Sequence, residues 1–182
     1  MKTASKTAIC SMIAALCLAL MLSTAVIPFL SYAIPMISGA LIMIIVIECD
    51  KLWALFVYVA VSILSLLIVP DKSAALAFAA YFGYYPILKA VIESKKLGVI
   101  EYVIKYFHIV FVVVGAYFLM LKFFGIETQD MEFFASHLGK WYSYIALAAF
   151  SCLFFYLYDT ALSKTVIIYQ HKLRKKFRRL FK

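Results

Sequence analysis

Five ionisable side chains in the middle of this chain have the types and the spacing that chemistry would need. Lys89 and Glu93 are four residues apart, and so are Glu101 and Lys105. His108 follows three residues after the second pair. The sequence around them is strongly apolar, and a charge inside an apolar membrane segment is costly enough to mark a functional site by default. A histidine at such a depth can relay protons or contact a ligand.

The spacing of these residues places each lysine on the same helix face as its glutamate. A turn over residues 95–98 folds the two segments into a hairpin, so we expect each lysine to reach the glutamate of the opposite helix as well. Two interpretations stay open. The charges form a structural clamp near the membrane interface, where lysines can snorkel, or they form a docking surface for a partner. We assign Lys89, Glu93, Glu101 and Lys105 to partner docking.

The composition predicts an integral membrane protein. Hydrophobic residues make up 66% of the 182 residues, whereas soluble domains contain about 45–50%. Several apolar runs reach about 20 residues, the length that a helix needs to cross the hydrocarbon core of a bilayer. The predicted fold class is all-α: a polytopic integral membrane protein with a compact bundle of about six transmembrane helices. This domain covers residues 1–170, and a basic juxtamembrane tail follows at 171–182.

The apolar runs and the residues that break them predict where the six helices lie. The second helix either starts at Pro35 or continues back through Ser31 behind a proline kink. Pro86 is expected to kink the fourth helix. The predicted ranges are 5–27, 36–47, 52–69, 73–94, 99–124 and a sixth helix from Trp141 into the tail, after an outer loop at 125–140.

Lysine and arginine are unevenly divided between the two sides of this topology. If six helices span the membrane, 15 of the 18 lysines and arginines lie on the side of the termini. The other three (Lys72, Lys122 and Lys140) lie on the opposite side. The positive-inside rule then places both termini in the cytoplasm, as in a multi-pass protein of the bacterial cell membrane. The apolar run after Lys6 also fits a signal peptide, but it is long and five more apolar segments follow, so we interpret it as a retained first span.

The basic tail predicts a contact with lipid headgroups rather than nucleic acid. Basic clusters directly after a membrane helix are attracted to the anionic inner leaflet. We expect the tail to orient and anchor the protein, with regulatory or RNA contacts as the alternatives. The residues assigned to lipid binding are Lys172, Arg174, Lys175, Lys176, Arg178 and Arg179.

Several kinds of catalytic site find no support in the sequence. It contains no HExxH motif, no glycine-rich nucleotide loop and no evident pair of nucleophile and base. His108, His137 and His171 fall at different predicted depths and cannot share a metal. The four cysteines lack metal-ligand spacing and are expected to be buried small hydrophobic residues without a disulfide. We therefore expect a non-enzymatic protein with no metal and no cofactor.

Aromatic and polar residues gather where the outer ends of the helices are predicted. Concave aromatic sites with a few polar groups suit small organic ligands. The alternative is the aromatic belt that membrane proteins carry at their interfaces. For His108 the alternatives are a ligand contact and a hydrogen bond to a neighbouring helix. The residues assigned to ligand binding are Tyr32, Asp71, Tyr81, His108, Tyr117, Lys122, Trp141 and Tyr144.

In layout, the chain resembles the substrate-binding S components of energy-coupling factor vitamin transporters. The shared features are about 180 residues, six helices, cytoplasmic termini, an alanine-striped first helix, a proline-bracketed segment after it and a substantial loop before the sixth helix. The resemblance implies a pocket open to the outside and a transmembrane coupling protein that recruits two ATPases. That protein would dock on the first helix through Ala8, Ala15 and Ala19.

A second resemblance is local. The segments LLIVPDKSAAL, YFGYYPILKAVIES and IEYVIKYF are similar to a group of uncharacterised small membrane proteins of clostridial bacteria. Together these features predict a membrane subunit that binds a small, vitamin-like substrate from outside for uptake with a separate coupling subunit and ATPases. The alternative is a small multi-span scaffold of the bacterial cell envelope with no transported substrate.

Overall fold

Helices account for all the regular structure in the part of the chain that the computed structural model describes, residues 3–26, 30–95, 99–119 and 140–173. The chain divides into two compact units. Unit 1 contains residues 1–96 and 160–182, and unit 2 contains residues 97–159. Counting one interrupted helix as a single element, the described ranges hold six helices, as predicted.

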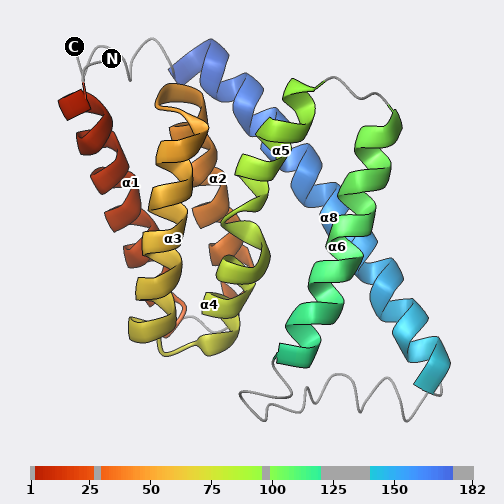
Figure 1. The fold of residues 1–182 in the computed structure, drawn as a ribbon. Coiled ribbons are helices and arrows are strands. Elements are labelled where there is room, and N and C mark those ends of the chain that lie inside the picture. Colours follow the sequence, from red (N-terminus) through yellow and green to blue (C-terminus); the bar gives the residue numbers. More distant parts are fainter. Residues whose placement is uncertain (1–2, 27–29, 96–98, 120–139, 174–182) are drawn as a thin grey trace. The chain divides into compact units, whose positions relative to one another are not determined.

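Three helices that contact one another form the first part of unit 1 (Figure 1). They are α1 (Thr3–Ser23), α2 (Ala33–Glu48) and α3 (Lys51–Ile68). Apolar side chains fill the space between them, whereas large apolar side chains such as Phe56 and Leu67 remain exposed on the outside. An exterior this apolar is typical of a surface that meets lipid or another protein.

Within the described residues, three helical segments are long and apolar enough to cross a membrane, judged by length and composition. They are Thr3–Ser23, Lys51–Ile68 and Lys72–Ser94. The helix α2 is shorter. It begins at Ala33, so it neither starts at Pro35 nor continues back through Ser31, and Pro35 lies in its first turn. Proline is tolerated there because the first backbone N–H groups of a helix have no partner within the helix. Its 16 residues span about 24 Å.

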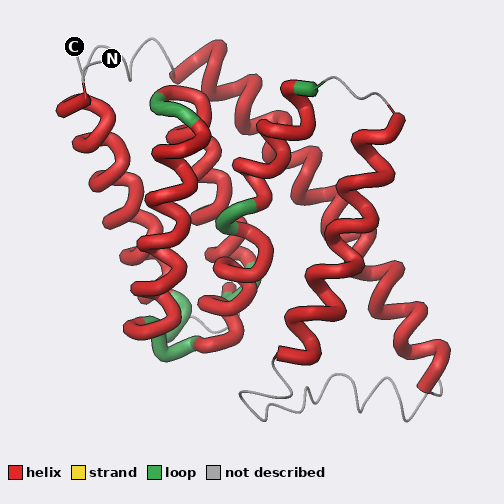
Figure 2. The backbone as a smooth tube through the Cα atoms, in the orientation of Figure 1, coloured by secondary structure: helices red, strands yellow, loops and turns green. Residues whose placement is uncertain are grey.

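The predicted fourth helix is broken into three pieces. A short helix, α4 (Lys72–Ala77), runs into the π-helix η2 (Phe78–Phe82), and α5 (Tyr85–Ser94) begins after a turn. Figure 2 shows this turn as a short loop inside the helical tube. The expected irregularity at Pro86 is confirmed, but Pro86 lies in the first turn of α5 and not inside a continuous helix.

Tyr58 of α3 stabilises the break. Its hydroxyl donates a hydrogen bond to the carbonyl of Ala79 at 2.6 Å, and the N–H of Gly83 donates to the carbonyl of Phe78 at 2.8 Å. A Cβ atom added at Gly83 would lie only 2.6 Å from Cδ2 of Tyr58. The glycine is therefore what allows the tyrosine ring to approach this helix.

Unit 2 is built from α6 (Val99–Leu119) and the first part of α8 (Lys140–Ile168). The rings of Tyr106 and Phe155 meet edge to face, with centroids 5.4 Å apart. The rest of α8 and the following π-helix η4 (Tyr169–Leu173) belong to unit 1. The sixth helix begins within one residue of its predicted start. The predicted end of the fifth helix and residues 125–139 of the predicted outer loop lie outside the described residues.

We predict that Gly83→Ala destabilises the protein by about 1–3 kcal/mol, because the added methyl group forces the Tyr58 ring away from its hydrogen bond. Thermal unfolding in mild detergent measures this. The matched control is Gly115→Ala on α6, where an added Cβ meets nothing within 4 Å. That variant should be unchanged or up to about 1 kcal/mol more stable, and equal losses in both variants would contradict the steric argument.

Candidate functional site

Lys89 is a buried residue of unit 1 and is paired with a glutamate on its own helix. Its side chain is 1% exposed, and its Nζ atom is 2.8 Å from a carboxylate oxygen of Glu93, which is 41% exposed. Both residues are on α5, one turn apart. The predicted pairing along the helix is confirmed, and the ammonium group points into the protein while the carboxylate remains at its edge.

Lys105 forms a similar but richer arrangement in unit 2. Its side chain is 3% exposed, and its Nζ atom lies 2.7 Å from Glu101 and 3.7 Å from Asp159 of α8. The two carboxylates are themselves largely buried, at 16% and 19% exposed. Asp159 is a partner that the sequence pattern did not predict. The available signal was that Asp159 is the one acidic residue in 140–173, and an isolated carboxylate in an apolar helix implies a cation nearby.

These two sites favour the structural interpretation of the central charges. Each lysine is held by a glutamate one turn away, and Asp159 adds a link between α6 and α8. The carboxylate of Glu93 is exposed enough to meet a partner, whereas the two lysines are not. The pairing of each lysine with the glutamate of the opposite helix stays a prediction.

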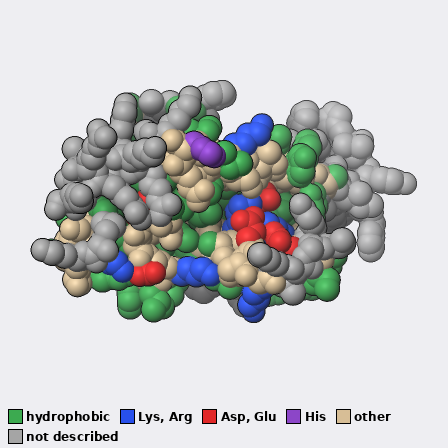
Figure 3. Space-filling view, turned by 90° about the horizontal axis from the view of Figure 1, so that it is seen from above, with side chains coloured by type: hydrophobic (Ala, Val, Ile, Leu, Met, Phe, Trp, Pro, Cys, Tyr) green, Lys and Arg blue, Asp and Glu red, His purple; other side chains and the backbone are tan. Residues whose placement is uncertain are grey.

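Two further polar contacts join ends of helices in unit 1: one links α1 to the start of α3, and the other links α3 to the end of α5, next to Glu93. Nζ of Lys6 on α1 lies 2.7 Å from a carboxylate oxygen of Asp50, which precedes α3. The ammonium group of Lys51 donates to the hydroxyl of Ser94, the last residue of α5, at 3.1 Å. We call Lys6, Asp50, Lys51, Glu93 and Ser94 the charged end of unit 1. In the space-filling view from above, acidic and basic side chains lie next to one another among apolar ones (Figure 3).

Asp71, assigned to ligand binding, caps a helix. Its carboxylate accepts hydrogen bonds from the backbone N–H groups of Ser73 and Ala74, at 3.1 and 3.2 Å, and from the Ser73 hydroxyl. A further hydrogen bond joins it to the Ser31 side chain, in the turn before α2. Burial alone would raise the pKa of the Asp71 carboxyl, but these hydrogen bonds outweigh it and hold the pKa below its usual range.

The neighbouring residue completes the same turn. The ammonium group of Lys72 donates to the carbonyls of Leu66 and Val69 at 2.8 and 3.0 Å. These carbonyls belong to the C-terminal end of α3, where backbone acceptors lack helical partners and a positive charge is favourable. The turn between α3 and α4 is thus stabilised by one side chain at each helix end.

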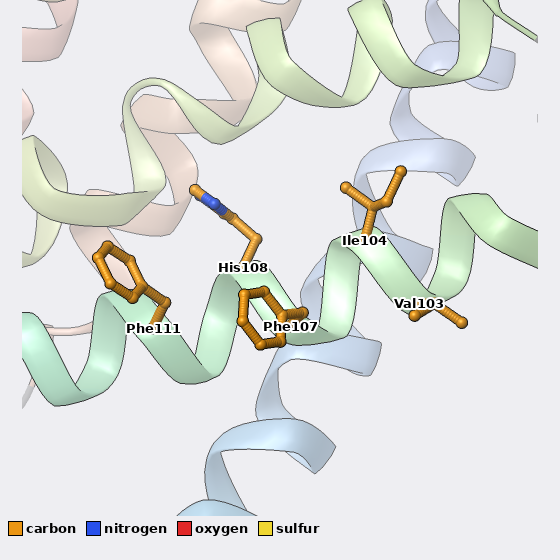
Figure 4. Close-up of a pocket in the computed structure, with 5 residues that line it drawn as sticks. All are labelled: Val103, Ile104, Phe107, His108 and Phe111. Carbon is orange, nitrogen blue, oxygen red and sulfur yellow. The ribbon is translucent and has the colours of Figure 1, made fainter.

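His108 lies in a shallow, largely open apolar hollow on the surface of α6. The hollow has a volume of about 510 Å³, and the described residues that line it are Val103, Ile104, Phe107, His108 and Phe111. Figure 4 shows Ile104 and His108 projecting from the same side of the helix. Among these lining residues only His108 is polar, so the hollow offers a large apolar surface with a single hydrogen-bonding group.

Of the remaining assigned ligand residues, Tyr32, Asp71 and Tyr81 belong to unit 1, and the side chains of the others lie outside the described part. Tyr32 is 60% exposed next to the start of α2, and Tyr81 is buried in η2 with its ring stacked on Tyr85 at 5.2 Å. The backbone of Tyr117 lies in α6 and that of Trp141 and Tyr144 in α8, but their side chains are outside the described part, as is the whole of Lys122.

The alanines assigned to partner docking are described, whereas most residues assigned to lipid binding are not. Ala8, Ala15 and Ala19 are exposed along one face of α1, away from its buried residues. They are therefore accessible to a neighbouring helix. For the lipid-binding set, the backbone of Lys172 lies in η4, but its side chain is not described. Arg174, Lys175, Lys176, Arg178 and Arg179 lie outside the described residues.

Comparisons with known proteins assign no family to this chain. No protein-family model, curated protein or solved structure matches it. The described residues also contain no group of three or more His, Cys, Asp or Glu side chains that could hold a metal ion. The resemblance in layout to the S components therefore stays a prediction.

We predict that Lys105→Met lowers the free energy of unfolding by about 3–5 kcal/mol, because it leaves two largely buried carboxylates without their cation. The triple variant with Glu101→Gln and Asp159→Asn should recover most of this loss. Unfolding in detergent by heat or denaturant measures both. Lys164→Met, at an exposed position on α8, is the control and should change stability by less than about 0.5 kcal/mol. Equal effects at the two lysines would rule out the ion pairs as a source of stability.

The cap at Asp71 predicts a pH dependence. Since its pKa is lower in the folded state than in the unfolded chain, its contribution is complete above the unfolded value of about 3.9 and is lost as the pH falls through the folded value. Asp71→Asn keeps a capping side chain but removes this titration. Stability measured between neutral and acidic pH should therefore fall more steeply in the wild type than in the variant, and parallel curves would contradict the prediction.

Proposed function

We propose that this protein is a non-enzymatic, multi-pass subunit of the bacterial cell membrane that captures a small, largely apolar organic molecule. Both termini face the cytoplasm, and six helices cross the bilayer. The observation that supports capture is the hollow at His108. Its volume of about 510 Å³ falls within the range of about 300–1,000 Å³ of small-molecule sites, which are mostly apolar with a few polar groups.

The chemistry of the hollow defines the class of ligand. Val103, Ile104, Phe107 and Phe111 offer apolar and aromatic surface, which suits a ring system or a short hydrocarbon chain. His108 offers one nitrogen donor and one acceptor when neutral, so it can orient a single carbonyl, hydroxyl or carboxyl group of the ligand. A vitamin-like molecule of mixed apolar and polar character meets these requirements.

Uptake requires a second protein in this proposal. The sequence has no nucleotide-binding glycine loop, so ATP-driven work belongs to a separate coupling subunit with ATPases. The exposed alanines of α1 provide a face on which such a transmembrane subunit can dock, because small side chains let helix backbones approach closely in lipid.

A scaffold of the cell envelope is the second candidate function, and it is favoured by the charged end of unit 1. Asp50 and Glu93 there are 67% and 41% exposed although each pairs with a lysine. Exposed carboxylates beside basic groups suit contacts with a cytoplasmic protein. A pull-down in mild detergent separates the two functions: capture predicts a coupling subunit and ATPases, whereas a scaffold predicts envelope or cytoskeletal proteins.

We predict that the purified protein carries a small molecule and that His108→Leu retains it at least about ten-fold less, since the variant loses one hydrogen bond in an apolar site. Mass spectrometry of molecules released from the protein measures retention. Phe111→Ala should also lower it, because apolar contact area is lost. The control is Phe56→Ala, which removes an exposed ring on α3 that lines no part of the hollow. Equal retention in all variants would refute capture at this site.

A further inference from the structure

Two cysteine thiols from different helices meet in unit 1. Cys10 is on α1, and Cys49 directly follows the last residue of α2. Their side chains are joined by a hydrogen bond, and both residues are buried. Both are free thiols.

A second contact, independent of the sulfur atoms, holds the same two chain segments together. Lys6 is one helical turn before Cys10, and Asp50 is the residue after Cys49. The 2.7 Å ion pair between Lys6 and Asp50 therefore joins α1 to the segment after α2 close to the two thiols. The other two cysteines are placed differently. Cys17 donates to the carbonyl of Ser38 at 3.5 Å, and Cys152 lies in the part of α8 that belongs to unit 2.

We propose that Cys10 and Cys49 form a dithiol modification site, which small thiol oxidants convert to a disulfide and trivalent arsenicals bridge. With a low-molecular-weight disulfide as the oxidant, a cysteine thiolate attacks one sulfur and releases one small thiol. The second cysteine then attacks the mixed disulfide and releases another. One S–S bond is broken and one is formed, and the two cysteine protons leave on the two small thiols.

The environment of the thiols sets the rate of this chemistry. Burial raises the pKa of the Cys49 thiol to about 12, and the nearby charge of Lys6 partly opposes this. Because the thiolate is the reactive form, oxidation is slow at neutral pH and accelerates as the pH rises. With this end in the cytoplasm, as proposed above, the reduced pair is the resting state, since cytoplasmic thiols are kept reduced. The oxidised pair joins α1 covalently to the end of α2.

The test uses the full-length protein in membranes. The membranes are treated with diamide, whose N=N bond takes up two electrons and two protons to give a hydrazine while two thiols become a disulfide. Free thiols are blocked with N-ethylmaleimide in denaturant, and newly reduced thiols are labelled with a polyethylene-glycol maleimide. The wild type, Cys17→Ser and Cys152→Ser should each gain two labels, whereas Cys10→Ser and Cys49→Ser should gain none.

Two measurements on the unsubstituted protein guard against variants that fail to fold. Peptide mass spectrometry after diamide should find Cys10 linked to Cys49. Phenylarsine oxide, which bridges two thiols and releases one water, should add one phenylarsenic group and block two labels. The proposal is overturned if diamide leaves four free thiols in the wild type, if the linked peptide contains Cys17 or Cys152, or if phenylarsine oxide leaves Cys10 and Cys49 reactive.

Discussion

Burial of lysine ammonium groups is the constraint on which much of this structure depends. Removing such a charge from water costs several kcal/mol unless an opposite charge accompanies it. Lys89 and Lys105 meet this requirement with glutamates on their own helices, at 2.8 and 2.7 Å. Each helix therefore brings a nearly neutral pair into its unit. Asp159 extends the second pair to α8, so an ion pair as well as apolar contact joins the two helices of unit 2.

The same requirement applies to uncharged polar groups and explains the irregular parts of unit 1. Pro86 and the π-helix η2 interrupt the regular backbone hydrogen bonds between α4 and α5. The Tyr58 hydroxyl supplies a donor to the Ala79 carbonyl, and Gly83 leaves room for its ring. In the turn between α3 and α4, Asp71 accepts from backbone N–H groups at the start of α4, and Lys72 donates to carbonyls at the end of α3. Asp71, which the sequence pattern assigned to ligand binding, thus has a structural role as a helix cap.

This assignment of structural roles narrows where function can lie. The buried lysines and the Asp71 carboxylate already have close partners within the protein. His108 is the polar member of an otherwise apolar set of residues that line the hollow. The exposed alanines of α1 and the exposed carboxylates of Asp50 and Glu93 are surfaces rather than pockets. The described structure therefore offers two kinds of candidate site: a hollow at His108 that suits a ligand, and exposed surfaces that suit a protein partner.

Local patterns in the sequence determined the helices, because apolar runs bounded by proline, glycine and charge fix where a helix can form. They also determined the pairing of each lysine with a glutamate one turn away, since that spacing is set within one helix. Tertiary structure alone decided the partners between helices: Asp159 beside Lys105, Tyr58 beside Ala79, and Cys10 beside Cys49. These contacts depend on how helices rotate and pack, and no local spacing encodes that. The pairing of the central charges within each helix could be predicted, but that both lysines are buried was decided by the fold.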